Sequence, residues 1–134
     1  MARCMAGKGA AYIVNAIRTA ALGVPLALED LDKQGVDATL VDLYSLPFDE
    51  EAILDLANEN NGMILTLEDN FGASIGSAVA DAASADGGGF TVSQMCVRRF
   101  PKSGRTPDDV LNYCGLSSDH IVQQAMAMLQ LTAV

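Results

Sequence analysis

Basic residues are scarce in this sequence, as are residues that bind metals or form disulfides. Eight lysines and arginines stand against 17 aspartates and glutamates, which gives a formal net charge of −9. Because nucleic acids and anionic membranes attract concentrated lysine and arginine, we expect neither as a partner. The chain has one histidine, His120, and three widely spaced cysteines, Cys4, Cys96 and Cys114. This pattern argues against a zinc site or a disulfide framework and favours a reducing cytoplasm.

Long hydrophobic runs are also missing. No apolar run approaches the roughly 20 residues that span a bilayer, and residues 1–10 lack the apolar stretch of a secretory signal. Half of the 134 residues are hydrophobic and 19% are charged, which is typical of a soluble globular domain. We therefore predict one domain over residues 1–134, with residues 1–9 as a flexible N-terminus.

Short apolar runs alternate with helical patterns along the chain. Strands are expected at residues 11–17, 38–43, 63–67 and 90–98. Helices are expected around residues 22–34, after Asp49, at 74–83, from Thr106 and from Ser117 or Ser118. In the first helix, Leu22, Leu26 and Leu31 are predicted to share one face. The alternation predicts an α/β fold, with a mostly parallel sheet covered by helices on both faces.

The first candidate site is the pair Glu68 and Asp69, at the end of the strand predicted over residues 63–67. Ligands of open α/β sheets bind beyond the carboxyl ends of strands, where two carboxylates suit a metal or acid–base chemistry. Successive strand residues point to opposite faces, however, so the two side chains are not expected to converge. The alternative is that they cap the following loop or helix, or contact a partner.

The second candidate is the glycine-containing stretch from Gly72 to Gly76, which opens a predicted helix. Such a loop can bind phosphate at a helix N-terminus, but the stretch matches neither GxGxxG nor a Walker A loop. The neighbouring acids, Glu68 and Asp69, would repel phosphate. Close backbone packing, within the sheet or across a dimer interface that includes Phe71, is the favoured interpretation.

The third candidate is a basic stretch of eight residues in an otherwise acidic chain. Half of all the basic residues lie in it, namely Arg98, Arg99, Lys102 and Arg105. The stretch could dock an acidic partner surface or bind a substrate phosphate. The alternative is a solvated loop with weak local salt bridges.

No combination of nucleophile and base emerges from the residues by themselves. His120 falls near a helix start with no nucleophile motif beside it, and the cysteines have no adjacent histidine pattern. We expect Cys96 to be buried in a strand and Cys114 to be more accessible. No catalytic residue is assigned.

Three segments, in this order, carry a family resemblance. They are residues 41–49 (VDLYSLPFD), residues 65–72 (LTLEDNFG) with Ile75 and Gly76, and residues 97–104 (VRRFPKSG). Together they resemble the C-terminal domain of transketolases, especially animal-type transketolases. The same domain ends the β subunits of 2-oxoacid dehydrogenases and deoxyxylulose-phosphate synthase. The resemblance covers about residues 10–130.

The resemblance implies a three-layer α/β/α domain with a five-stranded, mostly parallel sheet and one antiparallel strand. Four strands are clear in the sequence, and we expect the fifth within or near residues 90–99. Dimerisation is also implied. In this family, thiamine diphosphate and magnesium are held by the other two domains, so none of this chain's residues is assigned to cofactor or metal.

Two functions from different classes remain open. The first is a C-terminal domain or separate subunit of a split transketolase, whose partners are a second copy and the chains carrying the N-terminal and pyrimidine domains. Such an assembly transfers two-carbon ketol units between sugar phosphates, in the chemistry of pentose phosphates. The second is a non-catalytic docking or regulatory domain that binds a partner protein through residues 98–105. A flavodoxin-like binding module is a third, less favoured alternative.

Overall fold

The computed structural model describes residues 2–5, 11–16, 23–43, 45–72 and 74–132. These residues form one sheet in the order β1-β3-β2-β4-β5. Its strands are β1 (Ala2–Met5), β2 (Ala11–Ala16), β3 (Ala38–Leu43), β4 (Met63–Leu67) and β5 (Thr91–Met95). Neighbouring strands are parallel except for β1 and β3, which pair antiparallel at one edge. The predicted α/β class, with one antiparallel strand, is confirmed.

The fifth strand lies elsewhere than predicted. It is β1, which pairs with β3 from Ala2 opposite Leu43 to Met5 opposite Leu40. Residues 2–5 of the expected flexible N-terminus (1–9) form this strand, and residues 1 and 6–9 lie outside the described part. Residues 90–98 hold only β5, because the chain leaves the sheet after Met95.

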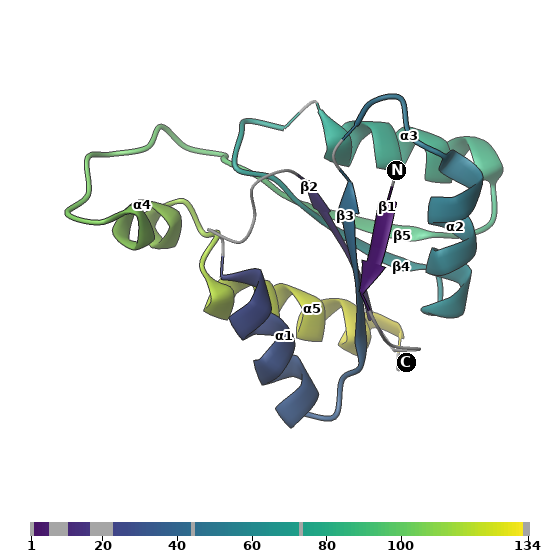
Figure 1. The fold of residues 1–134 in the computed structure, drawn as a ribbon, viewed down its shortest axis with the longest axis horizontal. Helices are drawn as coiled ribbons and strands as arrows, with labels where there is room; N and C mark the ends of the chain where they lie inside the picture. The colour runs from purple at the N-terminus through teal and green to yellow at the C-terminus, as the bar shows by residue number, and fades with distance from the viewer. Residues whose placement is uncertain (1, 6–10, 17–22, 44, 73, 133–134) are drawn as a thin grey trace.

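The helices of the described residues form two outer layers. They are α1 (Val24–Lys33), α2 (Glu50–Glu59), α3 (Ile75–Asp86), α4 (Pro107–Tyr113) and α5 (Ser118–Thr132). In Figure 1, α1 and α5 cover one face of the sheet and α2 and α3 cover the other, while α4 stands apart on an extended loop. The three-layer arrangement expected from the resemblance is confirmed.

Strand β4 runs through the centre of both cores. All five of its residues are buried, as expected for a parallel strand with helices on both faces. Met63, Leu65 and Leu67 pack against α1 and α5, whereas Ile64 packs against α2 and α3. This alternation has the two-residue period of a strand, and it directs Thr66 and Glu68 towards the side of α2 and α3.

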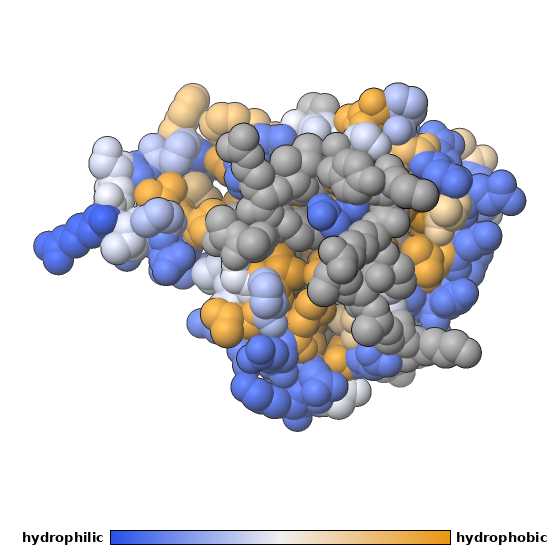
Figure 2. Space-filling model, viewed as in Figure 1, coloured by the Kyte–Doolittle hydropathy of each residue, from blue (hydrophilic) through white to orange (hydrophobic). Residues whose placement is uncertain are grey.

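Helix α1 begins with Pro25 in its first turn and ends before Gly35, which adopts a positive φ of 77°. A proline costs no hydrogen bond in the first turn of a helix, and a glycine readily adopts the left-handed conformation that ends one. The predicted apolar face is wrong, however, because Leu26 is 58% exposed while Leu31 is fully buried. The buried face consists of Val24, Ala27 and Leu31. The surface around the C-terminal end of the helix is hydrophilic (Figure 2).

Side-chain caps fix the starts of α2 and α4. The Asp49 carboxylate accepts a hydrogen bond from the Ala52 backbone N–H at 3.1 Å. At α4, Thr106 and Asp109 form a reciprocal capping box, in which each side chain accepts from the other residue's backbone N–H. No helix among the described residues is long and apolar enough to cross a membrane.

Candidate functional site

Glu68 is a buried carboxylate at the carboxyl end of β4, only 2% exposed. Its Oε2 accepts a hydrogen bond from the Ile75 backbone N–H at 3.2 Å, at the first residue of α3. The α3 N-cap, Ser74, makes no side-chain cap of its own, so Glu68 supplies the negative charge that a helix N-terminus favours. Its Oε1 has no hydrogen-bond partner among the described residues. Glu68 therefore caps the following helix, one of the two roles expected for it.

Asp69 differs from Glu68 in burial, because Asp69 is exposed. The two carboxylates do not share a burial environment, in keeping with the alternation expected of consecutive residues. The described residues contain no group of three or more His, Cys, Asp or Glu side chains placed to hold a metal ion. The structure thus gives no support to a metal site at this strand end.

Glycines in the following loop and in the first turn of α3 allow both to pack closely on β4, β5 and the residue after β5. At Gly76, an added Cβ would lie 2.8 Å from Gln94 Oε1 and 2.9 Å from Thr66 Oγ1. Gly72 has a φ of 82°, and its added Cβ would lie 3.2 Å from Cys96 Sγ. A phosphate at the start of α3 would meet the Glu68 carboxylate already bonded there. Close backbone packing, the favoured interpretation of these glycines, agrees with this geometry.

Replacing Gly76 with alanine is expected to lower the free energy of unfolding by about 1–3 kcal/mol. Alanine is the better helix former by about 1 kcal/mol, but its methyl group would press on the buried Thr66 hydroxyl and move α3 outward. Ser77→Ala, one position further along α3, is the matched control and should leave stability nearly unchanged. Urea unfolding followed by circular dichroism measures both variants. Equal or greater stability of Gly76→Ala would contradict the packing described.

Two exposed aromatic rings join the loop after β4 to the basic stretch. Phe71 is 65% exposed and Phe100 is 87% exposed, and their ring centroids lie 6.2 Å apart in an edge-to-face arrangement. The Asn70 carbonyl accepts from the Val97 N–H at 2.7 Å, and the Asn70 side chain accepts from the Gly72 N–H at 2.9 Å. These bonds hold the two segments together, so the surfaces that the sequence separates into a dimer face and a docking loop are continuous.

Phe100 was missed as a site residue by the sequence analysis. The available signal was a large aromatic side chain inside a cationic loop, where nothing predicts a core position for it. Tyr113 was missed as well: the Arg99 guanidinium and the Lys102 ammonium each lie 5.2 Å from the centre of its ring. Such cation–π contacts hold long basic side chains in place.

The basic residues of the 98–105 stretch make different contacts. Arg98 donates from Nη2 to the Gln94 carbonyl oxygen at 3.2 Å, whereas Arg99 and Lys102 lie over Tyr113. Arg105 is exposed, and its backbone N–H donates to the Asp109 carboxylate at 3.1 Å. The ion pair found among the described residues joins Lys33 and Asp30, so the local salt bridges that the alternative interpretation predicts for this stretch are not formed there.

The two described cysteines have the environments predicted for them, and His120 is half-buried. The Ser117 hydroxyl and His120 Nδ1 form a hydrogen bond at the start of α5. Cys96 is buried, and Cys114 is half-buried.

Comparison with known proteins identifies the domain. The model of the transketolase C-terminal domain matches residues 24–121. The chain belongs to the transketolase C-terminal domain family. Transketolase-like protein 1 of Bos taurus is 37% identical over 98 residues, which cover 72% of this chain and 16% of that protein. Homo sapiens transketolase is 34% identical over 105 residues, covering 77% of this chain and 16% of the enzyme.

Solved structures extend the likeness of this transketolase C-terminal domain to nearly its full length. A split-gene transketolase, in an inactive beta4 tetramer, superposes with a TM-score of 0.79 at 28% identity, over 96% of this chain and 43% of that one. The transketolase of Pichia stipitis in complex with sedoheptulose 7-phosphate shares the fold, with a TM-score of 0.68 at 18% identity. The chain thus spans about one sixth of the curated relatives that it matches.

Proposed function

We propose that this chain supplies the C-terminal domain of a transketolase assembled from several domains or chains. The assembly transfers two-carbon ketol units between sugar phosphates. The observation that carries the proposal is the similarity of almost the whole chain to one part of a split-gene transketolase chain. Its role is dimerisation and assembly, with partners that carry the N-terminal and pyrimidine domains.

The exposed pair Phe71 and Phe100 is the proposed contact of this assembly. Exposed aromatic clusters rimmed by polar residues are typical of interaction surfaces. Asn70 and its hydrogen bonds hold the Phe71 loop against the segment that carries Phe100, and little reorganisation is therefore needed on binding. We assign this surface to the homodimer or to the pyrimidine-domain partner.

Thiamine diphosphate and magnesium belong to the partner domains in this proposal. The described residues of this chain do not fit them: no cluster of metal-ligating side chains is present among them. Glu68, the buried carboxylate closest in character to a ligand, is engaged by the start of α3. We therefore derive no catalytic step for this chain. We also assign the assembly to the cytoplasm, because the odd number of widely spaced cysteines suits reducing conditions.

Reconstitution tests this function directly. The purified chain is mixed with the chain or chains of the same organism that carry the other two domains, and ketol transfer from a ketose phosphate to an aldose phosphate is followed. We expect activity in the mixture and none from either component alone. Calorimetry of the isolated chain with thiamine diphosphate should give no binding heat.

Two outcomes would contradict the proposal. Binding of micromolar thiamine diphosphate by the isolated chain would move the cofactor site onto it. A stable complex that forms but never becomes active would instead favour the docking or regulatory domain, which the unpaired basic residues of the 98–105 stretch also suit.

A further inference from the structure

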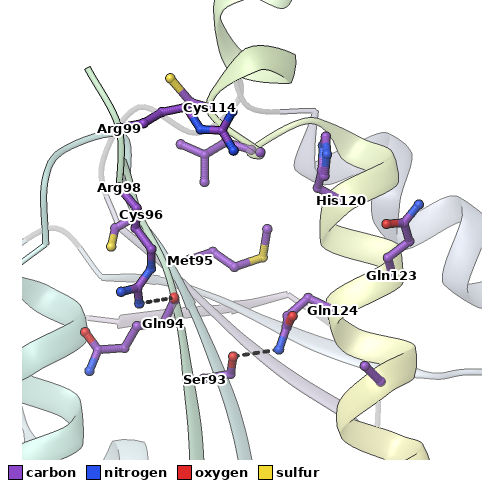
Figure 3. A pocket seen from close by; sticks show the side chains of 13 residues that line it. Ser93, Gln94, Met95, Cys96, Arg98, Arg99, Cys114, His120, Gln123 and Gln124 are labelled. Atoms are coloured by element: carbon purple, nitrogen blue, oxygen red, sulfur yellow. Dashed lines mark hydrogen bonds between the residues drawn. The ribbon is translucent and has the colours of Figure 1, made fainter. Parts of the chain in front are cut away.

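A cavity of about 480 Å³ lies between β5 and α5. Strand β5 is an edge of the sheet. This strand and the segment that follows it form one wall of the cavity. Arg98 and Arg99 project from this side, and His120, Gln123 and Gln124 come from α5 on the other (Figure 3). The volume is within the range of small-molecule sites.

The charge of this cavity is opposite to that of the chain. Among the described residues that line it, there are two arginines and a histidine but no aspartate or glutamate, although the chain carries 17 acidic residues. Charges further than about 8 Å away are largely screened at physiological ionic strength. An anion inside the cavity would therefore respond to the local cations rather than to the net charge of −9.

The cations of the cavity are held in place without a carboxylate partner. Arg98 is fixed by its hydrogen bond to the Gln94 carbonyl, and Arg99 by its position over Tyr113. In the described part of the chain, the ion pair recorded is Lys33 with Asp30, on another element. Neither contact uses all five N–H donors of a guanidinium, so both arginines keep donors for a ligand.

The α5 wall adds further donors. His120 Nδ1 is hydrogen-bonded to the Ser117 hydroxyl. When that hydroxyl donates, Nε2 carries the ring proton and can donate to an anion. Gln124 is fixed by its bond from Nε2 to Ser93 Oγ at 2.8 Å (Figure 3), while the Gln123 side chain is exposed. Met95, Leu116 and Ala127 supply apolar lining.

We propose that this cavity binds a phosphorylated small molecule. A phosphate dianion matches a guanidinium group, which can donate a pair of parallel hydrogen bonds to its oxygens. The apolar lining suits the unphosphorylated part of such a ligand. The inference does not rest on the proposed function.

Titration with phosphate probes tests the site. The ¹⁵N-labelled full chain is titrated with inorganic phosphate and with pyrophosphate, and sodium chloride at equal ionic strength is the reference. We expect amide shifts confined to residues 93–99 and 114–127. Arg98→Gln and Arg99→Gln should each weaken binding about tenfold or more, since each removes a charged donor. Arg105→Gln, which removes an equally exposed charge outside the cavity, should bind as the parent does.

A second pair of variants keeps the test independent of the arginines. Gln124→Glu places a carboxylate in the cavity beside Ser93 with almost no change in shape and should abolish phosphate binding (Figure 3). Gln130→Glu puts the same charge on an exposed position of α5 outside the cavity and should have no effect. Shifts spread over basic residues elsewhere, equal shifts with chloride, or unchanged binding by Gln124→Glu would overturn the proposal.

Discussion

Replacing Leu31 with alanine is expected to lower the free energy of unfolding by about 2–5 kcal/mol. Leu31 has no exposed surface and lies in the core between α1, α5 and β4. Truncation removes buried methyl groups and leaves a cavity that the surrounding helices and strand can fill only in part. Because the free energy of unfolding of a domain of this size is about 5–15 kcal/mol, the variant loses a large share of it. Chemical denaturation measures the change, with the same dependence of the free energy of unfolding on denaturant concentration in both proteins.

Leu26→Ala is the matched control for this experiment. It makes the same substitution in the same helix, at a side chain that is 58% exposed. Little apolar surface is returned to water there, so the expected loss is below about 1 kcal/mol. Similar losses for the two variants would contradict the orientation of α1 and favour the alternative in which Leu26 and Leu31 share a buried face.

Phe100→Ala and Phe71→Ala are each expected to weaken assembly by about 30-fold, or roughly 2 kcal/mol, the size of an interface hot spot. Both rings are exposed in the isolated chain, so their loss should hardly change its stability. Because the rings contact each other, the double variant should lose less than the sum of the two single losses. Sedimentation velocity of the chain alone, and calorimetry with the partner chain, measure the two associations.

The control for these variants is Leu46→Ala. Leu46 is a large apolar side chain that is 52% exposed, in the loop before α2 and outside the aromatic pair. Its truncation should leave assembly unchanged. If Leu46→Ala weakened association as much as the phenylalanine variants, or if those variants associated normally, the proposed contact surface would be wrong.

Elements with a strong local signal could be predicted from the sequence. The run at residues 63–67 is apolar at four of five positions and forms the fully buried strand β4. Asp49 and Thr106 are followed by acidic residues at helix starts, and both form the caps expected of them. In each case the residues that decide the structure are neighbours in the chain.

Features that depend on distant pairing could not be predicted. Strand β1 is four residues long, and only its partner β3 makes it a strand. The face of α1 was misplaced because Leu26 is apolar yet exposed, and the smaller Ala27 occupies the core instead. The Phe71–Phe100 contact joins segments on either side of α3 and β5, so no local pattern indicates it. Glu68 is an intermediate case: its capping role was among the alternatives, but its complete burial was not foreseen.

The arm that carries α4 behaves differently from the sheet. Helix α4 has no buried residue; its Leu111 is only partly buried where it packs against the core of α1, α5 and β4. Regions with few buried contacts open at a lower free-energy cost than the core does. We therefore expect the arm to open more readily than the sheet, and a molecule that binds beside it can restrict this opening without rearranging the sheet. Association would first reduce the local motion of α4. The free energy of global unfolding would still depend on the core around β4.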